Sequence, residues 1–441
     1  MSFVPSKTSP TIELQAVDGL RAYTGNARTH SKKQIRQIAD SIKEFGFTNP
    51  VLVSDDNEII AGHGRVEAAK LLGLEKIPTI RLSHLTAAQR RAYVIADNRL
   101  AEKAGWDQEI LTIELKALMD LNFDTEIIGF SPTEIEVLLE ENSASSPEER
   151  DTDDTVPVMP QTAISRPGDI WVLGRHRLIC GDARETQSFE RLLGEERADL
   201  IFTDPPYNVP IDGHVCGNGR IRHREFAMGV GEMTPAAFTM FLETTLGRAA
   251  GHCRNGAIAF VCMDWRHMGE LLNAGRAAFS ELKNVCVWNK TNGGMGTFYR
   301  SKHELVFVYK IGKAEHTNTF GLGDGGRYRT NVWDYAGVNT AKPERADELA
   351  MHPTVKPVTL VADAIKDCTK RGEVVLDCFG GSGTTLIAAE RTGRKARLIE
   401  FDPLYCDVIL RRFEKITGKP VTLAETGETF ETAAEARKIA S

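Results

Sequence analysis

The stretch Leu200-Ile201-Phe202-Thr203-Asp204-Pro205-Pro206-Tyr207-Asn208 decides how the larger part of this chain is organised. Its apolar start, residues 200–203, predicts a buried strand, and the carboxylate of Asp204 follows directly at the strand end. Proline has no backbone N–H, so Pro205 and Pro206 keep their carbonyls free of a competing donor, and Tyr207 adds an aromatic face. Such a strand end suits a planar ligand that carries an amino group.

A second strand end points to a cofactor. The apolar run 374–376 leads into Asp377 and then into the glycine-rich loop Phe379-Gly380-Gly381-Ser382-Gly383, with a helix expected over 386–391. Backbone N–H groups in a glycine loop ahead of a helix approach a ligand closely. The next expected strand, 396–399, ends in Glu400, where an acid is suited to the hydroxyls of a ribose. This pattern predicts a nucleoside-type ligand.

The segments around these two motifs alternate between strands and helices, as in a mainly parallel α/β sheet. We expect strands over 170–173, 177–182, 200–203, 257–261, 284–288 and 304–309, and a helix over 186–193. Residues 311–349 are rich in glycine, polar residues and arginine. We interpret them as an insertion carried by the sheet rather than a part of it.

Together, DPPY (204–207) and FGGSG (379–383) resemble the two motifs of the S-adenosylmethionine-dependent amino-methyltransferases of DNA, over about residues 168–418. The order of the motifs resembles the circularly permuted β group. HPTVKP (352–357) and the segment 288–310 match further parts of that group. The resemblance implies a Rossmann-like sheet, S-adenosylmethionine as cofactor and no metal for the transfer.

The resemblance also implies roles for single residues. Asp204, Pro205, Pro206 and Tyr207 would be catalytic: Asp204 and the Pro205 carbonyl accept hydrogen bonds from the amino group, and Tyr207 stacks on a flipped base. The expected cofactor-binding residues are Asp182, Lys356, Asp377, Phe379, Gly381, Gly383, Thr384 and Glu400. Residues 311–349 would be the target-recognition region, and the expected DNA contacts are Arg300, Lys302, Arg327 and Arg329.

These residues favour a site-specific enzyme, of the restriction-modification kind, that methylates N6 of adenine in double-stranded DNA. The nearest alternative is N4-cytosine methylation, in which serine usually replaces Asp204. None of the 18 prolines is followed by cysteine, which disfavours the C5-cytosine enzymes. A DNA-binding protein whose second domain only holds cofactor is a further alternative. The resemblance allows a homodimer.

The first block of the chain mixes short strands and helices. A helix is expected over 34–42, strands over 50–53 and 58–60, and a helix over 66–72 after Gly62-His63-Gly64-Arg65. This block resembles the ParB-like nuclease (ParB/sulfiredoxin) superfamily, which implies a small α+β domain. In that superfamily the matching turn commonly handles phosphates. A tight turn without such a role is the alternative, and the sulfiredoxin cysteine is absent.

Composition sets the remaining expectations. The 21 residues 134–154 contain nine acidic residues and one arginine, which predicts a solvated linker. The net charge of −7 confines DNA contacts to local basic patches. Eight scattered cysteines without a CxxC pair, and no apolar run for a membrane, predict a cytoplasmic protein with reduced thiols and no metal site. The expected divisions are an N-terminal tail (1–17), a ParB-like domain (18–142), an acidic flexible linker (143–167), a methyltransferase domain (168–420) and a C-terminal tail (421–441).

Overall fold

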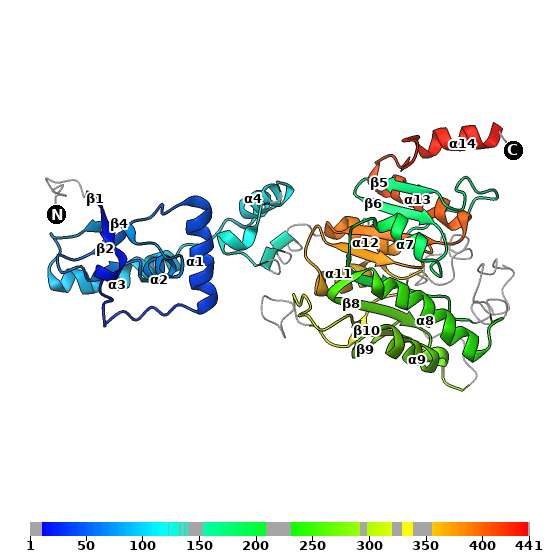
Figure 1. Ribbon diagram of the computed structural model, residues 1–441, viewed down its shortest axis with the longest axis horizontal. Coiled ribbons are helices and arrows are strands. Elements are labelled where there is room, and N and C mark those ends of the chain that lie inside the picture. Colours follow the sequence, from blue (N-terminus) through cyan, green and yellow to red (C-terminus); the bar gives the residue numbers. More distant parts are fainter. Residues whose placement is uncertain are drawn as a thin grey trace. The chain divides into compact units, whose positions relative to one another are not determined.

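The computed structural model describes residues 11–121, 123–131, 134–135, 138–139, 153–208, 231–291, 298–319, 329–337 and 355–439. The chain divides into two compact units, Met1–Ala144 and Ser145–Ser441. Figure 1 draws the first unit in blue to cyan and the second mostly in green to red. Each unit is described by itself.

The first unit is a small α+β domain, as the sequence predicts. Its four-stranded sheet has the order β1 (Ile12–Ala16), β4 (Lys76–Arg81), β2 (Val51–Val53) and β3 (Ile59–Ala61). Its helices are α1 (Lys32–Phe45), α2 (His63–Leu71), α3 (Ala87–Glu102) and α4 (Gln108–Asp120), with short 3-10 turns at Val17–Gly19 and Thr125–Ile128. The side chain of Ser31 caps α1, and a capping box of Thr86 and Gln89 starts α3.

The second unit is built on a mixed ten-stranded sheet. Its strand order is β11-β9-β10-β8-β7-β12-β13-β6-β5-β14. The bounds are β5 (Ile170–Leu173), β6 (His176–Cys180), β7 (Ala198–Thr203), β8 (Cys253–Met263), β9 (Glu281–Asn289), β10 (His303–Lys310), β11 (Val332–Asp334), β12 (Val374–Asp377), β13 (Lys395–Glu400) and β14 (Thr422–Leu423). The middle strands β8, β7, β12, β13 and β6 run parallel, so their carboxyl ends share one edge.

Helices cover both faces of this sheet, as in a Rossmann-like fold. One hydrophobic core contains residues of α11 (Val358–Cys368), α12 (Thr384–Thr392), α13 (Pro403–Thr417) and α14 (Phe430–Ile439). The other contains residues of α7 (Thr186–Leu193), α8 (Pro235–Gly251) and α9 (Met268–Ala278). Because the middle strands are covered on both faces, their central residues are consecutive buried apolar side chains, for example Leu200-Ile201-Phe202 of β7.

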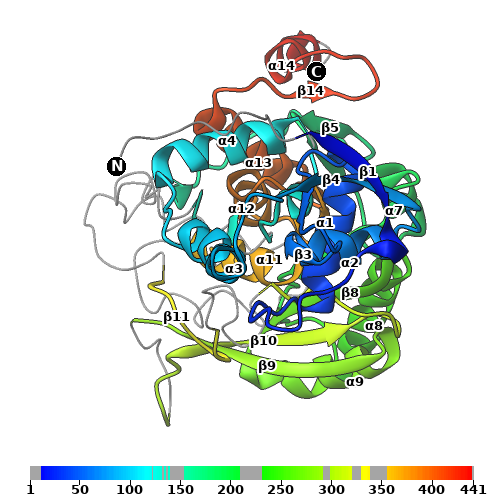
Figure 2. The same cartoon turned by 90° about the vertical axis from the view of Figure 1, so that its left-hand side faces the viewer.

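The interpretation of 311–349 as an insertion outside the sheet is wrong at β11. Residues 332–334 pair in parallel with β9 and form the sheet edge, and Figure 2 shows β9, β10 and β11 side by side. Trp333 is buried there and its indole N–H donates to the carbonyl of Thr330. The strand has only three residues, so it lacked the alternation that would reveal it.

The expected tails are also shorter than predicted. Residues 12–16 form β1 and pair with β4, whereas a tail to residue 17 was expected. At the other end, β14 pairs with β5, and Phe430 of α14 packs edge-on against Trp171. The ends of the chain therefore contribute to both sheets.

The second half of the expected linker is packed against the second unit. Asp153 pairs with Arg391, its backbone carbonyl accepts from Arg412, and the carboxylate of Asp407 accepts the N–H groups of Ile164 and Ser165. The sequence predicts solvated acids at 153 and 154, but Arg391 pairs with the Asp153 carboxylate and the backbone N–H of Val358 donates to Asp154. The prediction of a flexible linker is therefore wrong for 153–167. Residues 143–152 lie outside the described residues.

None of the helices in the described ranges combines the length and the apolar character that crossing a membrane requires.

Candidate active site

Three of the predicted site carboxylates follow neighbouring parallel strands. Asp204 comes directly after β7, Asp377 is the last residue of β12 and Glu400 the last of β13. Thr203 joins the first two strand ends, since its hydroxyl donates to Asp377 at 2.9 Å and accepts from the N–H of Cys378 at 3.2 Å. Parallel strands place their carboxyl ends at one edge, so the two motifs meet although about 170 residues separate them.

A cluster of charged side chains surrounds Asp204. The ammonium Nζ of Lys356 lies 2.5 Å from Asp204 Oδ2, 2.7 Å from Glu304 Oε1 and 3.1 Å from the hydroxyl oxygen of Tyr207. That hydroxyl lies 2.6 Å from Asp204 Oδ1 and within hydrogen-bonding distance of Glu304. Lys290 completes the cluster, with its Nζ 2.6 Å from Glu304 Oε2.

The charges in this cluster balance two ammonium groups against two carboxylates. Burial raises the pKa of Asp204; Lys356 opposes the shift and Glu304 adds to it. Burial acts in the same direction on Glu304, but Lys356 and Lys290 outweigh it and hold its pKa well below the usual range. Burial lowers the pKa of Lys356, yet Asp204 and Glu304 outweigh it and raise this pKa. The pKa of Tyr207 is raised, chiefly by burial, so its hydroxyl keeps its proton.

The glycine loop forms a cradle beside this cluster. Glu400 accepts the backbone N–H of Gly381 at 2.7 Å and that of Asp402 at 2.9 Å, and Asp377 accepts that of Phe379 at 3.1 Å. Gly381 and Gly383 have positive φ, +52° and +82°. A Cβ at Gly383 would lie 3.2 Å from Ile409, whereas one at Gly381 would meet nothing nearer than 3.9 Å. The loop is thus closely packed on one side and open at Gly381.

Two carboxyl groups in the cradle titrate near neutrality. Burial raises the pKa of both Asp377 and Glu400 to about 7. Hydrogen bonds to each carboxylate oppose the shift, whereas the negative charge of Asp204 adds to it for Asp377 and the charges of Asp402 and Asp377 add to it for Glu400. Buried carboxylates beside an open glycine loop fit a ligand that offers hydroxyl donors or a positive charge.

Other expected cofactor residues lie near this edge with different partners. Asp182 follows β6 and forms an ion pair with Arg184, 2.6 Å between Nη2 and Oδ2, in a local turn. Phe379 packs against Phe241 of α8, and Thr384 is the first residue of α12. Lys356, expected beside the cofactor, has its ammonium directed instead to Asp204 and Glu304.

The expected DNA contacts differ from one another. Arg300 and Lys302 are exposed in the segment that leads into β10, next to the exposed rings of Phe298 and Tyr299. Arg329, by contrast, is directed into the protein. Its Nε donates to Asp367 at 3.0 Å and its Nη1 donates to the Tyr335 hydroxyl at 2.9 Å. The charge of Arg329 is thus compensated inside the protein, and its expected contact with DNA is tested by substitution below. Arg327 lies outside the described residues.

The glycine-arginine turn of the first unit opens helix α2. Gly62 has φ +100° at the residue before the helix, and Arg65 donates to the carbonyl of Asn49 at 2.8 Å. Gly64 is closely packed, because a Cβ there would lie 3.0 Å from Ile38. The Nε2 atom of His63 is buried without a hydrogen-bond partner. His63 lines an open pocket of about 1060 Å³ whose basic residues are Arg28, His30, Lys32, Lys33, Arg36 and Lys70.

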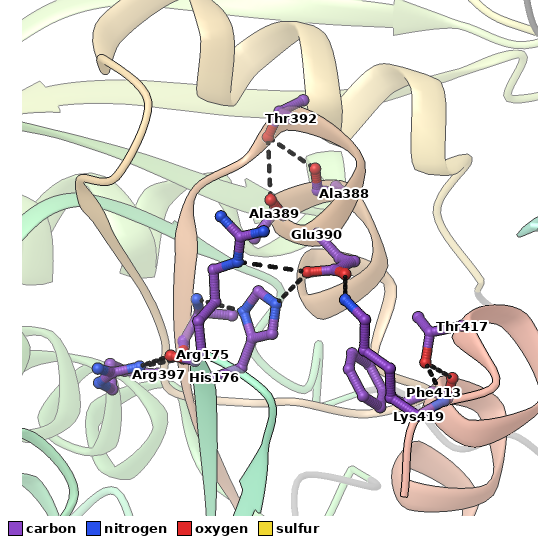
Figure 3. Close-up of polar contacts among 11 residues, drawn as sticks. Arg175, His176, Ala388, Ala389, Glu390, Thr392, Arg397, Phe413, Thr417 and Lys419 are labelled. Atoms are coloured by element: carbon purple, nitrogen blue, oxygen red, sulfur yellow. Dashed lines mark hydrogen bonds and ion pairs between the residues drawn. The ribbon is translucent and has the colours of Figure 1, made fainter. Parts of the chain in front are cut away.

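A second cluster of titratable groups, around His176, is structural. Its Nε2 lies 2.9 Å from Glu390, and its Nδ1 accepts the N–H of Ala396 at 2.8 Å. Lys419 also binds Glu390, at 2.5 Å, and Arg175 lies 3.6 Å away (Figure 3). With both ring nitrogens occupied and the ring buried, His176 cannot exchange a proton with a substrate.

Sequence reasoning missed Glu304 and Lys290 as members of the site. Glu304 stands at the start of β10, which is antiparallel to β8, so the beginning of this strand reaches the edge where the parallel strands end. The available signal was an acid directly before the apolar run Leu305-Val306-Phe307-Val308, because such a run predicts a buried strand. No cluster of His, Cys, Asp and Glu that could hold a metal occurs in the part of the chain that the structure describes.

Known proteins resemble three parts of the chain. Residues 198–411 match the model of a DNA methylase family, residues 109–167 match the ParB-methyltransferase HTH domain, and residues 6–98 match the ParB N-terminal domain. The HTH match includes both the end of the expected ParB-like domain, 109–142, and the expected linker, 143–167.

Two curated proteins and one solved structure illustrate what the chain is similar to. The ParB-like nuclease domain-containing protein YnaK of Escherichia coli (strain K12) is 54% identical over 72 residues, which cover 16% of this chain and 83% of YnaK. The type II methyltransferase M.HinfI of Haemophilus influenzae is 27% identical over 250 residues, 52% of this chain and 67% of that enzyme. The crystal structure of the M1.HpyAVI-SAM complex aligns at 20% identity with a TM-score of 0.40, covering 53% of this chain and 97% of that one.

Proposed function

Because the chain belongs to the DNA methylases of the N6/N4 class and carries a ParB-like domain ahead of the methylase domain, we propose that it transfers a methyl group from S-adenosylmethionine to N6 of adenine in double-stranded DNA. The observation that carries the proposal is the pairing of Asp204 and Tyr207 with the glycine cradle at one sheet edge. The type II methyltransferases among its relatives support a site-specific, restriction-modification role.

The cradle residues fit the proposed cofactor. Glu400 and Asp377 would accept its hydroxyl groups, and the open side of the loop at Gly381 leaves room that a side chain would fill. Asp182, Phe379, Gly383 and Thr384 would complete the contact from the same edge. When bound, S-adenosylmethionine supplies an electrophilic methyl group on a positively charged sulfur.

The residues of DPPY would hold the amine for in-line attack. In a duplex the amino group is paired, so the base must leave the stack at a cost of about a few kcal/mol. Stacking on Tyr207 would offset part of this cost, by about 1 to 3 kcal/mol. Asp204 and the carbonyl of Pro205 would accept the amine protons and favour the positive charge that develops on nitrogen. Pro206 stiffens the turn that holds these groups together.

Adenine is proposed because the first residue of the motif is aspartate, and N4-cytosine methylation is the alternative. Incubation of DNA with the protein and S-adenosylmethionine, followed by nucleoside mass spectrometry, distinguishes the two. We expect N6-methyladenine. N4-methylcytosine without N6-methyladenine would refute the choice of base.

The catalytic role itself is tested with Asp204→Ala. We expect loss of methyl transfer with retained cofactor binding, and Asp264→Ala, a change of the same type at a partly buried aspartate paired with Arg266, serves as the control. A wild-type protein that binds the cofactor but transfers no methyl group would support the alternative of a ParB-like DNA-binding protein with a non-catalytic second domain.

For the first unit we propose a role in binding phosphate groups, on DNA or a nucleotide. Its support is the basic pocket and the unpartnered Nε2 of His63 in the turn Gly62-His63-Gly64-Arg65. Arg36→Ala in the full chain should weaken binding of duplex DNA or of nucleoside triphosphates measured by fluorescence anisotropy. Equal binding of both ligands by the wild type and the variant would contradict this role.

A further inference from the structure

Lys356 makes contacts that a cofactor-binding residue does not need. An ammonium group has three N–H donors, and the nearest polar atoms around its Nζ belong to Asp204, Glu304 and Tyr207. Only 5% of its side chain is exposed. Its ammonium also lies 5.5 Å from the ring centroid of Tyr207 and 6.0 Å from that of Trp288. The amine-binding cluster thus takes up the whole polar end of this side chain.

Both oxygens of Asp204 are oriented by this arrangement. Oδ2 accepts from Lys356 at 2.5 Å, and Oδ1 lies 2.6 Å from the Tyr207 hydroxyl. A carboxylate oxygen can accept two hydrogen bonds, so each keeps a lone pair for the protons of an incoming amine. A protonated Asp204 would lose part of this capacity, because one oxygen would become a donor.

Glu304 fixes the position of the lysine. It contacts Lys356 through one oxygen and Lys290 through the other, and 9% of its side chain is exposed. Without an ammonium between them, Asp204 and Glu304 would be two carboxylates in a poorly solvated site, where one of them takes up a proton. Lys290 rests over the ring of Trp288, 4.5 Å from its centroid, and compensates the second charge.

We infer that Lys356 is a positioning residue for methyl transfer: held by Glu304 and Tyr207, its ammonium keeps Asp204 ionised and turned so that it can accept the substrate amine. This role rests on the proposed function and deepens it. It assigns to Lys356 and Glu304 a part in amine recognition in place of the cofactor contact that the resemblance implies for Lys356.

The electrostatic neighbours of Asp204 allow the role to be tested by pH. The charged or titratable groups facing it are Lys356 ahead of α11, Tyr207 in its own turn, Glu304 on β10 with Lys290 behind it, and Asp377 on β12. Cys262 on β8 faces the same cluster, and burial raises its pKa so far that it stays neutral. Replacing Lys356 by Met removes the positive charge that forms an ion pair with Asp204 in the described part of the chain.

The experiment measures kcat for methyl transfer to duplex DNA from pH 5.5 to 9, with the purified full-length chain. In Lys356→Met the acidic limb should move up by about one pH unit or more, a loss of rate of roughly tenfold at any pH on that limb. In Glu304→Gln the limb should move the other way, because a negative charge beside Asp204 is removed. The double variant should lie between the single variants, and Lys356→Arg should keep the wild-type limb.

Two further measurements separate this role from a structural one and from cofactor binding. Lys283→Met, the same change at a lysine paired with Glu281 on the exposed part of β9, should leave the profile unchanged. S-adenosylmethionine binding by Lys356→Met, measured by calorimetry, should stay within about threefold of wild type; a greater loss would return Lys356 to the cofactor site and overturn the inference.

The outcomes distinguish the inference from the proposed function. If the wild type methylates DNA and Lys356→Met retains the wild-type acidic limb, the positioning role is refuted and the function stands. If the acidic limb of the double variant lies at the same pH as that of Lys356→Met, Glu304 has no part in controlling the ionisation of Asp204. A wild-type protein that methylates no DNA would refute the proposed function before the variants are compared.

Discussion

Cofactor binding by this protein should release protons. Asp377 and Glu400 have pKa values raised to about 7 by burial, so near neutral pH each carboxyl group is about half protonated in the cofactor-free protein. Hydroxyl donors and the positive charge of S-adenosylmethionine favour the ionised carboxylates. Binding at pH 7 should therefore expel about half a proton from each group, about one in total.

The same values give the pH dependence of affinity. Lowering the pH from 7 to 6 reduces the ionised fraction of one such group roughly fivefold, and the joint ionised fraction of two independent groups roughly 30-fold. Above pH 8 little more is gained, because both groups are already mostly ionised. The affinity for cofactor should thus fall by roughly 5- to 30-fold between pH 7 and pH 6.

Calorimetry measures both quantities. Titrating the protein with S-adenosylmethionine at pH 7 in buffers of different ionisation enthalpy gives the number of protons released from the slope of enthalpy against buffer enthalpy. Glu400→Gln keeps an oxygen that accepts the N–H of Gly381 but cannot ionise, so it should roughly halve the release. Glu243→Gln, on the exposed face of α8, should change nothing. A binding enthalpy that is the same in all buffers, together with a constant affinity from pH 6 to 8, would refute this reasoning.

Three further predictions follow from the same structure. The pKa values of Asp377 and Glu400 are higher in the folded than in the unfolded protein, so protonation of these groups stabilises the fold. This contribution is full below about pH 4 and is lost as the pH rises through 7. The unfolding temperature of the cofactor-free wild type should therefore fall more steeply from about pH 4 to pH 7 than that of Glu400→Gln. Arg412→Met removes charged hydrogen bonds to the carbonyls of Ser382 and Asp153, so unfolding in urea should show a loss of about 2 to 4 kcal/mol, with exposed Arg411→Met near wild type. Arg329→Met should lower the unfolding temperature and leave the affinity for DNA within about twofold of wild type. Lys302→Met should weaken DNA binding and reduce the salt dependence of that binding in filter-binding assays. Weaker DNA binding by Arg329→Met and unchanged binding by Lys302→Met would contradict the assignment of Arg329 to the interior.

Much of the fold was predictable because its signals are local. The helix expected over 186–193 is α7 with the same bounds, the strand expected over 170–173 is β5, and the apolar run 374–376 lies within β12. Buried middle strands are short apolar runs that end in a polar residue, and this pattern lies within a few residues of sequence. The positions of Asp204 and Asp377 at strand ends were predicted from the same kind of signal. What these residues do in the reaction remains a prediction.

The rest depends on pairings between distant segments. The partners of Asp204 stand at positions 304 and 356, and no spacing in the sequence relates these to residue 204. Arg329 was expected at the DNA because a cation among glycines and polar residues is typical of a binding loop, but Asp367, 38 residues away, compensates it. Whether a charged residue faces solvent or an internal partner is decided by tertiary packing, which the sequence pattern does not contain.

The position of Lys356 in the chain connects the two halves of the site. It lies directly before α11, which packs against α12, and α12 begins at Thr384 at the end of the glycine loop. The single segment 356–384 therefore supplies the ammonium that contacts Asp204, the carboxylate of Asp377 and the cradle. Since Thr203 also joins the Asp204 strand end to Asp377, a shift of the glycine loop on cofactor binding has two direct routes to the amine acceptor, one through the hydroxyl of Thr203 and one through α11 to Lys356. The amine acceptor and the cradle are thus joined by direct contacts through Thr203 and Lys356, although the two motifs that define them lie far apart in the sequence.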